Sequence, residues 1–141
     1  MDDDRSSHAQ AIAAIAEAGI TTGCDDSGQI FCPDAIVTRA QMATFLVRAL
    51  DLPAAETDYF NDDQGSIHED AINRLAAAGV TQGCREDSYC PRDPIERAQM
   101  AAFLTRALDL AASEVDFFTD DARSSHEAAI NSLAADGATS G

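Results

Sequence analysis

The chain has no lysine and no tryptophan. All nine basic residues are arginines, aspartate and glutamate together number 25, and the formal net charge is −16. A surface this acidic repels phosphate backbones and anionic lipid headgroups, which argues against nucleic acid or a membrane surface as a partner. The charge is compatible with divalent cations, with solubility in concentrated salt and with a polyhydroxylated ligand.

Long hydrophobic runs are also missing. No apolar stretch approaches the roughly 20 residues that a membrane-spanning helix needs, so direct membrane insertion is not expected. Residues 1–4 are acidic where a secretory signal peptide is basic, so the signal peptide of an exported protein would lie upstream of them. With 141 residues, of which 45% are hydrophobic, the chain has enough material for one compact domain.

Catalytic motifs are absent from the sequence. It contains no Gly-x-Ser-x-Gly, no glycine-rich phosphate loop and no His-Glu-x-x-His. Carboxylate pairs occur throughout such an acidic chain and therefore give no evidence for a glycosidase. We expect no catalytic residues, no enzymatic activity and no required cofactor.

What the sequence does contain is a repeat with a period of about 60 residues. His8, His68 and His126 are spaced by 60 and 58 residues, and an acidic pair precedes each of them. The period predicts repeat 1 over residues 1–52, a linker over 53–59, repeat 2 over 60–110, a linker over 111–117, and the first helix of a truncated repeat 3 over 118–141. The chain is thus two full repeats plus a half repeat.

Each full repeat is predicted to fold as helix, loop, helix, because apolar residues recur with helical spacing in two segments. In repeat 1 these residues are Ile12, Ile15 and Ala16 in the first helix and Met42, Phe45, Leu46, Ala49 and Leu50 in the second. Capping patterns at residues 7–10, 66–69 and 124–127 would begin the first helices. Patterns at residues 38–41 and 93–96, the latter with Pro94 as the first helical residue, would begin the second helices. Gly19, Gly79 and Gly137 would end the first helices.

A longer motif runs through the repeats. It reads Phe-x-Asp, then Ala-Ile-x-x-Leu-Ala-x-x-Gly-Val-x-x-Gly, then a short loop with an aromatic residue before x-Pro, and finally (Ile/Val)-Thr-Arg-Ala-Gln followed by Leu-x-Arg-Ala-Leu. This motif resembles the S-layer homology (SLH) repeat of bacterial surface proteins over nearly the whole chain. The resemblance implies an all-α fold in which tandem helix-loop-helix repeats form a pseudo-threefold bundle. The half repeat would supply the third central helix.

Four cysteines occupy equivalent positions in the two full repeats, in a loop where the SLH pattern usually has none. The alignment favours the pairs Cys24–Cys32 and Cys84–Cys90, because each bond then closes a loop within one repeat. The spacings fit neither a zinc knuckle nor a Cys-x-x-Cys redox pair, so a metal site and free thiols are the less favoured alternatives. Disulfides indicate an oxidising compartment and hence an exported protein.

Arginines begin both second helices, where the helix dipole disfavours a cation. The resemblance implies that the Thr-Arg-Ala-Glu segment of SLH repeats lies in a groove between repeats and contacts an acidic cell-wall polysaccharide. The candidate ligand-binding residues of this chain are therefore Thr38, Arg39 and Gln41, together with Arg97 and Gln99 in repeat 2. A bidentate guanidinium suits a sugar carboxylate.

An alternative interpretation of these arginines is an ion pair within the chain, to Asp2, Asp62 or Asp120. The sequence also departs from the SLH pattern near the candidate site. Glu96 replaces the expected threonine, and the positions equivalent to a tryptophan of the family are Ser7, Ile67 and Ser125.

The histidines and the acidic pairs are expected to be structural. We interpret the histidines as surface or loop-bracing residues of the first helical turn, with metal ligation as the alternative. We interpret the acidic pairs as N-terminal caps that also compensate a helix dipole, with Ca²⁺ binding as the alternative, although no copy has the Asp-x-Asp-x-(Asp/Asn)-Gly pattern of a calcium loop.

By resemblance, the chain is a non-catalytic anchoring module of the bacterial cell surface that recognises a cell-wall polysaccharide through grooves between repeats. The alternative prediction is a structural module of a surface layer or filament, which packs against other protein chains.

Overall fold

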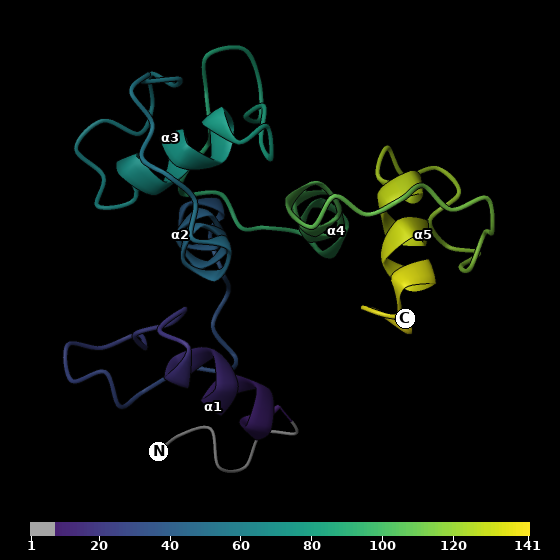
Figure 1. Ribbon diagram of the computed structural model, residues 1–141, viewed down its shortest axis with the longest axis horizontal. Helices are drawn as coiled ribbons and strands as arrows, with labels where there is room; N and C mark the ends of the chain where they lie inside the picture. The colour runs from purple at the N-terminus through teal and green to yellow at the C-terminus, as the bar shows by residue number, and fades with distance from the viewer. Residues whose placement is uncertain (1–7) are drawn as a thin grey trace.

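A computed structural model describes residues 8–141. These residues form helices and loops without a β-strand (Figure 1). The helices are α1 (Ala9–Glu17), α2 (Arg39–Leu50), α3 (Glu69–Ala77), α4 (Arg97–Ala107) and α5 (Glu127–Asp136). The all-α repeat architecture is confirmed, with two helices in each full repeat and one in the half repeat.

The first helix of a repeat packs against the second helix of the repeat before it. Thus α3 lies against α2, and α5 lies against α4 (Figure 1). The half repeat therefore adds a flanking helix, equivalent to α3, and not the third central helix that the resemblance implied. The pseudo-threefold bundle stays a prediction.

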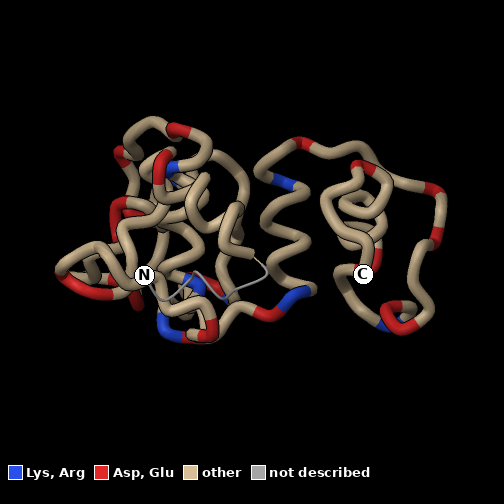
Figure 2. The backbone as a smooth tube through the Cα atoms, turned by 90° about the horizontal axis from the view of Figure 1, so that it is seen from below, with Lys and Arg blue, Asp and Glu red and all other residues tan. Residues whose placement is uncertain are grey.

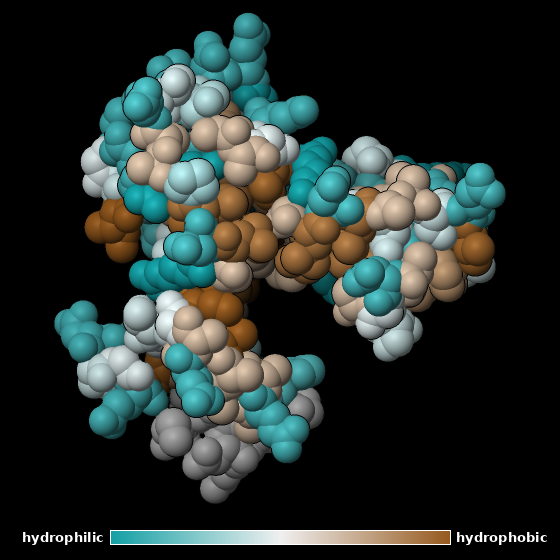
Figure 3. Space-filling model, viewed as in Figure 1, coloured by the Kyte–Doolittle hydropathy of each residue, from teal (hydrophilic) through white to brown (hydrophobic). Residues whose placement is uncertain are grey.

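One cluster of buried side chains joins α2, α3, α4 and the loop between α3 and α4. Ile72, Leu75 and Tyr89 have no more than 1% of their surface exposed. Apolar residues gather where these elements meet (Figure 3). Burying each large apolar side chain contributes about 1.5–3 kcal/mol. The described part of α1, in contrast, buries only Ile12.

The N-terminus of α2 is capped twice. Thr38 and Gln41 form the predicted capping box, in which the Thr38 Oγ1 accepts the Gln41 N–H and the Gln41 Oε1 accepts the Thr38 N–H. The next two N–H groups, of Arg39 and Ala40, donate to main-chain carbonyls of repeat 2, at Asp93 (2.9 Å) and Pro91 (3.1 Å). Repeat 2 therefore satisfies helix-end donors of repeat 1.

The predicted start of α4 at residues 93–96 is wrong. The helix begins at Arg97, and Glu96 is its N-cap, paired with Gln99 in a capping box. Pro94 is instead paired with Thr38 in an isolated antiparallel bridge, and the Ile95 N–H donates to the Val37 carbonyl (3.0 Å). Residues that the sequence pattern assigned to the helix are therefore extended and pair with repeat 1.

The predicted capping boxes of α3 and α5 are also wrong. The N-caps are His68 and His126, each directly before its helix, and neither makes a side-chain capping bond. Ser66 and Ser124 instead accept the N–H two residues later, of His68 and His126, at 3.1 Å in both copies. The serines close a turn ahead of the helix. In repeat 1, Ser7 lies outside the described residues.

Both predicted disulfides, Cys24–Cys32 and Cys84–Cys90, are present. A main-chain hydrogen bond closes each loop as well, from Cys24 N–H to the Ile30 carbonyl (2.7 Å) and from Cys84 N–H to the Ser88 carbonyl (2.9 Å). Acidic residues are spread over the loops of the chain (Figure 2). In each of the two disulfide loops, the covalent bond and a main-chain bond together close the turn.

Gly83→Ala should destabilise the domain more than Gly79→Ala. Both glycines have positive φ, +84° and +75°, which costs an alanine about 1 kcal/mol. A Cβ at Gly83 would also lie 2.4 Å from the Ser88 carbonyl oxygen and 2.7 Å from the Phe60 ring, whereas a Cβ at Gly79 meets nothing within 4 Å. Urea denaturation of both variants measures the difference; equal losses of stability would contradict the close approach.

Candidate functional site

Arg39 lies inside the junction between repeats 1 and 2. The residue is only 6% exposed, and its Nε donates to the Tyr89 carbonyl oxygen at 2.8 Å. The guanidinium carbon lies 4.8 Å from the centre of the Tyr89 ring and 5.4 Å from that of Phe103. Both distances are within the range of a cation–π interaction. Arg39 therefore joins α2 to the loop of repeat 2 and to α4.

Tyr89 completes this junction. Its hydroxyl donates to the Arg39 carbonyl oxygen at 2.8 Å, and its ring lies 5.5 Å from that of Phe60. Burial of the phenol raises the pKa of Tyr89 well above its usual value. The hydroxyl thus stays protonated, as its donor role requires.

Asp62 does not form the ion pair with Arg39 that the alternative interpretation of the arginines proposed. Its carboxylate accepts the main-chain N–H groups of Tyr89 and Cys90, both at 2.8 Å. Among residues 8–141, the ion pair that is present joins Arg74 and Asp70. Asp2 lies outside the described residues. The repeated aspartate therefore holds the backbone of the disulfide loop.

A groove of about 320 Å³ lies between the start of α2 and the segment that leads into α3. Its wall contains Thr38 and Ala40 from repeat 1 and Pro91 and Arg92 from the end of the disulfide loop. The segment 62–66 and His68 form the other side. We call this the α2–α3 groove. Of the predicted ligand residues, it contains Thr38, with Arg39 buried behind it and the exposed Gln41 beside it.

The sequence suggested a surface or a bracing histidine, and His68 is of the bracing kind. Its Nδ1 is 2.7 Å from the Thr44 Oγ1 of α2, so the side chain links the two repeats. Burial lowers the pKa of His68, and the positive charge of Arg48 adds to this effect. The neutral form of this ring, which lines the groove, is therefore favoured.

Asp63 is a buried carboxylate in the α2–α3 groove. The residue is 1% exposed, and neither of its carboxylate oxygens has a hydrogen-bond partner in the described structure. Burial raises the pKa of Asp63, and the nearby carboxylates of Asp58, Glu69 and Asp62 raise it further. The folded state therefore favours the protonated acid.

Asp63→Asn should stabilise the domain relative to the parent, and more so as the pH rises. Because the pKa of Asp63 is higher in the folded than in the unfolded chain, its contribution to stability is full below the unfolded pKa and is lost as the pH rises through the folded pKa. An asparagine avoids that loss. Urea denaturation at pH 3 and pH 7 measures the effect, with the exposed Asp116→Asn as control. A gain that is equal at both pH values would contradict the raised pKa.

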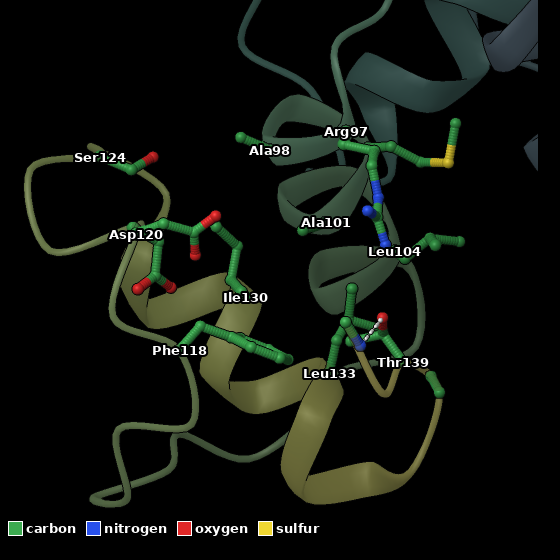
Figure 4. A pocket seen from close by; sticks show the side chains of 14 residues that line it. Arg97, Ala98, Ala101, Leu104, Phe118, Asp120, Ser124, Ile130, Leu133 and Thr139 are labelled. Atoms are coloured by element: carbon green, nitrogen blue, oxygen red, sulfur yellow. Dashed lines mark hydrogen bonds between the residues drawn. The ribbon is translucent and has the colours of Figure 1, made fainter.

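A second groove, of about 520 Å³, lies between α4 and α5 (Figure 4). Arg97 and Leu104 on the α4 side face Phe118, Asp120 and Leu133 on the α5 side. We call this the α4–α5 groove. Its other lining residues are Ala98, Met100, Ala101, Asp121, Ser124, Ile130, Ala138, Thr139 and Gly141.

The two predicted arginines therefore differ in accessibility. Arg39 is enclosed, whereas the Arg97 side chain is exposed at its groove and makes no hydrogen bond or ion pair within residues 8–141. Gln99 accepts the Glu96 N–H in the capping box (3.2 Å). Of the five predicted ligand residues, Thr38 lines the α2–α3 groove and Arg97 lines the α4–α5 groove, whereas Arg39, Gln41 and Gln99 line neither.

The described residues contain no group of three histidine, cysteine, aspartate or glutamate side chains placed to hold a metal ion.

Known proteins are similar to this chain in sequence. The model of the S-layer homology domain family matches residues 1–43 and 62–101, which is more than half of the chain. The chain belongs to the S-layer homology domain family. Membership makes this SLH domain a cell-surface anchoring module.

Named relatives agree with this assignment. The SLH domain is 30% identical over 125 residues to an endoglucanase of Bacillus sp. (strain KSM-635), covering 89% of this chain and 13% of that protein. It is 33% identical to a cell surface protein of Thermoanaerobacter kivui (74% and 14% covered) and 34% identical to an S-layer protein of Bacillus thuringiensis subsp. finitimus (68% and 12%). The chain thus spans no more than 14% of the length of these relatives. Within its described residues, no helix has the length and apolar character needed to cross a membrane.

Proposed function

We propose that this SLH domain anchors its protein by binding a cell-wall polysaccharide in the α2–α3 groove. The observation that carries the proposal is a polar groove built at the junction of two repeats, with Thr38 in its wall and Arg92 at the end of the disulfide loop. A concave site with a few convergent polar groups is typical of ligand binding.

The available donors suit an acidic glycan. The Thr38 oxygen accepts a bond within the helix cap, which leaves its hydroxyl proton for a ligand, and the Gln41 amide likewise keeps its NH₂ group. Arg92 supplies an exposed guanidinium, which pairs well with a sugar carboxylate. Arg39 contributes by holding the loop that carries Arg92.

The domain itself is proposed to be non-catalytic. The endoglucanase relative is matched over 13% of its length, and the part matched is the SLH segment of this chain. Any catalytic activity of a longer protein would then reside outside the SLH repeats.

Binding to purified cell-wall polysaccharide, measured by pull-down, tests the glycan proposal. Arg92→Ala should weaken binding by about tenfold or more, because it removes a charge-assisted hydrogen bond. Arg85→Ala is the matched control, since Arg85 lies in the same loop but not in the groove wall. Failure of the parent to bind, or equal binding by the two variants, would contradict the proposal.

Assembly with other protein chains is the second candidate function. The observation that favours it is the α4–α5 groove, whose wall contains apolar side chains of both helices, among them Leu104 and Leu133. An apolar groove of this kind accepts a protein side chain better than a charged sugar.

A further inference from the structure

Asp63 is a buried carboxylate that the chain itself leaves unbonded. It lies in the wall of the α2–α3 groove, it is 1% exposed, and neither of its carboxylate oxygens accepts a hydrogen bond within residues 8–141. Buried polar groups of native proteins are nearly always hydrogen-bonded, so an unbonded one that borders a groove indicates a missing partner. The equivalent residue of repeat 3, Asp121, is buried as well (8% exposed).

The carboxylates around Asp63 already have partners in the chain. Asp62 accepts two main-chain N–H groups of the disulfide loop, both at 2.8 Å. Glu69 accepts the main-chain N–H four residues before it (2.8 Å), and Asp58 accepts the side-chain amide of Asn73 (3.4 Å). Asp63 is therefore the member of this acidic group whose two oxygens are left for a ligand in the groove.

The surroundings of Asp63 favour a cation as that ligand group. Burial raises the pKa of Asp63, and the negative charges of Asp58, Glu69 and Asp62 raise it further. A positive charge in contact with the carboxylate would offset both effects, because it stabilises the ionised form. The chain does not supply this charge: the neutral form of His68 is favoured, and no side chain of residues 8–141 is bonded to the Asp63 oxygens.

A primary ammonium fits this site better than a metal ion does. The described residues contain no group of three acidic, histidine or cysteine side chains placed to hold a metal. An ammonium has three N–H donors and makes a charge-assisted bond to a single carboxylate. The groove, at about 320 Å³, is near the small end of ligand sites, which span about 300–1,000 Å³. Thr38, Gln64 and Ser66 add polar groups that suit the hydroxyls of a sugar.

We propose that the sugar bound in the α2–α3 groove carries a free amino group, whose ammonium donates to the Asp63 carboxylate. This inference rests on the proposed function of the groove and names the chemistry of its ligand. An N-acetylated sugar is the poorer occupant, because its amide is uncharged and has a single N–H to donate. With Arg92 holding an acidic group of the same glycan, the recognised ligand is zwitterionic, and Asp63 determines specificity for the amine.

The probe is the β-1,4-linked tetramer of glucosamine, titrated into the 141-residue chain by calorimetry at pH 6. The N-acetylated tetramer should bind at least about tenfold more weakly, because it lacks the charge-assisted bond. Asp63→Asn should weaken binding of the glucosamine tetramer by about tenfold for the same reason. Asp136→Asn is the matched control: it removes the same charge from an exposed residue that lines neither groove, and it should leave the affinity unchanged.

Equal affinity for the two tetramers, or equal affinity of the two variants for the glucosamine tetramer, overturns the inference. Tighter binding of a tetralysine peptide that Asp63→Asn abolishes overturns it too, since the occupant would then be a protein side chain.

The inference and the proposed function are separated with purified cell-wall polysaccharide, before and after chemical N-acetylation of its amino groups. N-acetylation should weaken binding to the parent chain by about tenfold. A polysaccharide that binds equally well in both forms leaves the proposed function in place and overturns the inference. One that binds in neither form contradicts the proposed function, whereas the glucosamine tetramer decides the role of Asp63 independently.

Discussion

Tyr89→Ala is expected to lower the free energy of unfolding by about 3–5 kcal/mol, the range for removing a buried aromatic side chain. The ring is completely buried, and its removal opens a cavity bounded by Phe60 and the Arg39 guanidinium. It also leaves the Arg39 side chain without its stacking partner. Since most domains have only about 5–15 kcal/mol of stability, the loss should be visible directly in a urea titration.

Two further variants separate the contributions of Tyr89. Tyr89→Phe keeps the ring and removes the hydroxyl that donates to the Arg39 carbonyl, so it should cost only about 0.5–1.5 kcal/mol. Tyr59→Ala removes an equally large ring that is 41% exposed and should cost less than Tyr89→Ala. A Tyr89→Ala variant as stable as Tyr59→Ala would show that the loop does not hold the repeats together.

Arg39→Ala and Arg97→Ala should differ sharply although they stand at equivalent positions. We expect Arg39→Ala to cost at least about 2 kcal/mol, because it removes a buried charge-assisted hydrogen bond to the Tyr89 carbonyl and a cation placed over two rings. The Arg97 side chain is exposed and makes no hydrogen bond or ion pair with any described residue, so Arg97→Ala should stay within about 0.5 kcal/mol of the parent.

A double-mutant cycle extends this comparison. If Arg39 acts through Tyr89, then Arg39→Ala should cost little in a Tyr89→Ala background, because neighbouring residues that share one contact are not additive. The coupling is measured from the urea midpoints of the four proteins, provided that the unfolding free energy depends equally on urea concentration in all four. Equal effects of Arg39→Ala and Arg97→Ala would contradict the different burial of the two side chains.

The repeat made much of the fold predictable. The apolar stripes gave the helix order, the α2 capping box followed from Thr38 and Gln41, and the paired cysteines were assigned by local closure. These features depend on residues close together in sequence, where spacing alone determines the contact. The capping box at residues 38–41 was predicted correctly because it depends on local contacts alone. The segment 93–96 was not, because it pairs with residues of repeat 1.

The junctions between repeats could not be predicted in this way. Pro94 and Ile95 pair with a strand-like segment some 57 residues earlier, and no local pattern marks that partner. The sequence also gave no sign that Asp62 would bind main-chain N–H groups, or that Asn73 and Asn131 would accept the N–H groups of Tyr59 and Phe117. The recurrence of that asparagine in two repeats was the available signal for the last pair.

Because each first helix packs on the preceding repeat, the repeats of the sequence and the packed helix pairs of the fold have different boundaries. The segment that repeats in the sequence runs from one acidic pair to the next, whereas the helices that pack together are α2 with α3 and α4 with α5. In amide hydrogen exchange, protection should therefore be shared between α2 and α3, across the boundary of the repeated segment. The Cys84–Cys90 loop closes within repeat 2 and, through the buried Tyr89, is expected to share that protection.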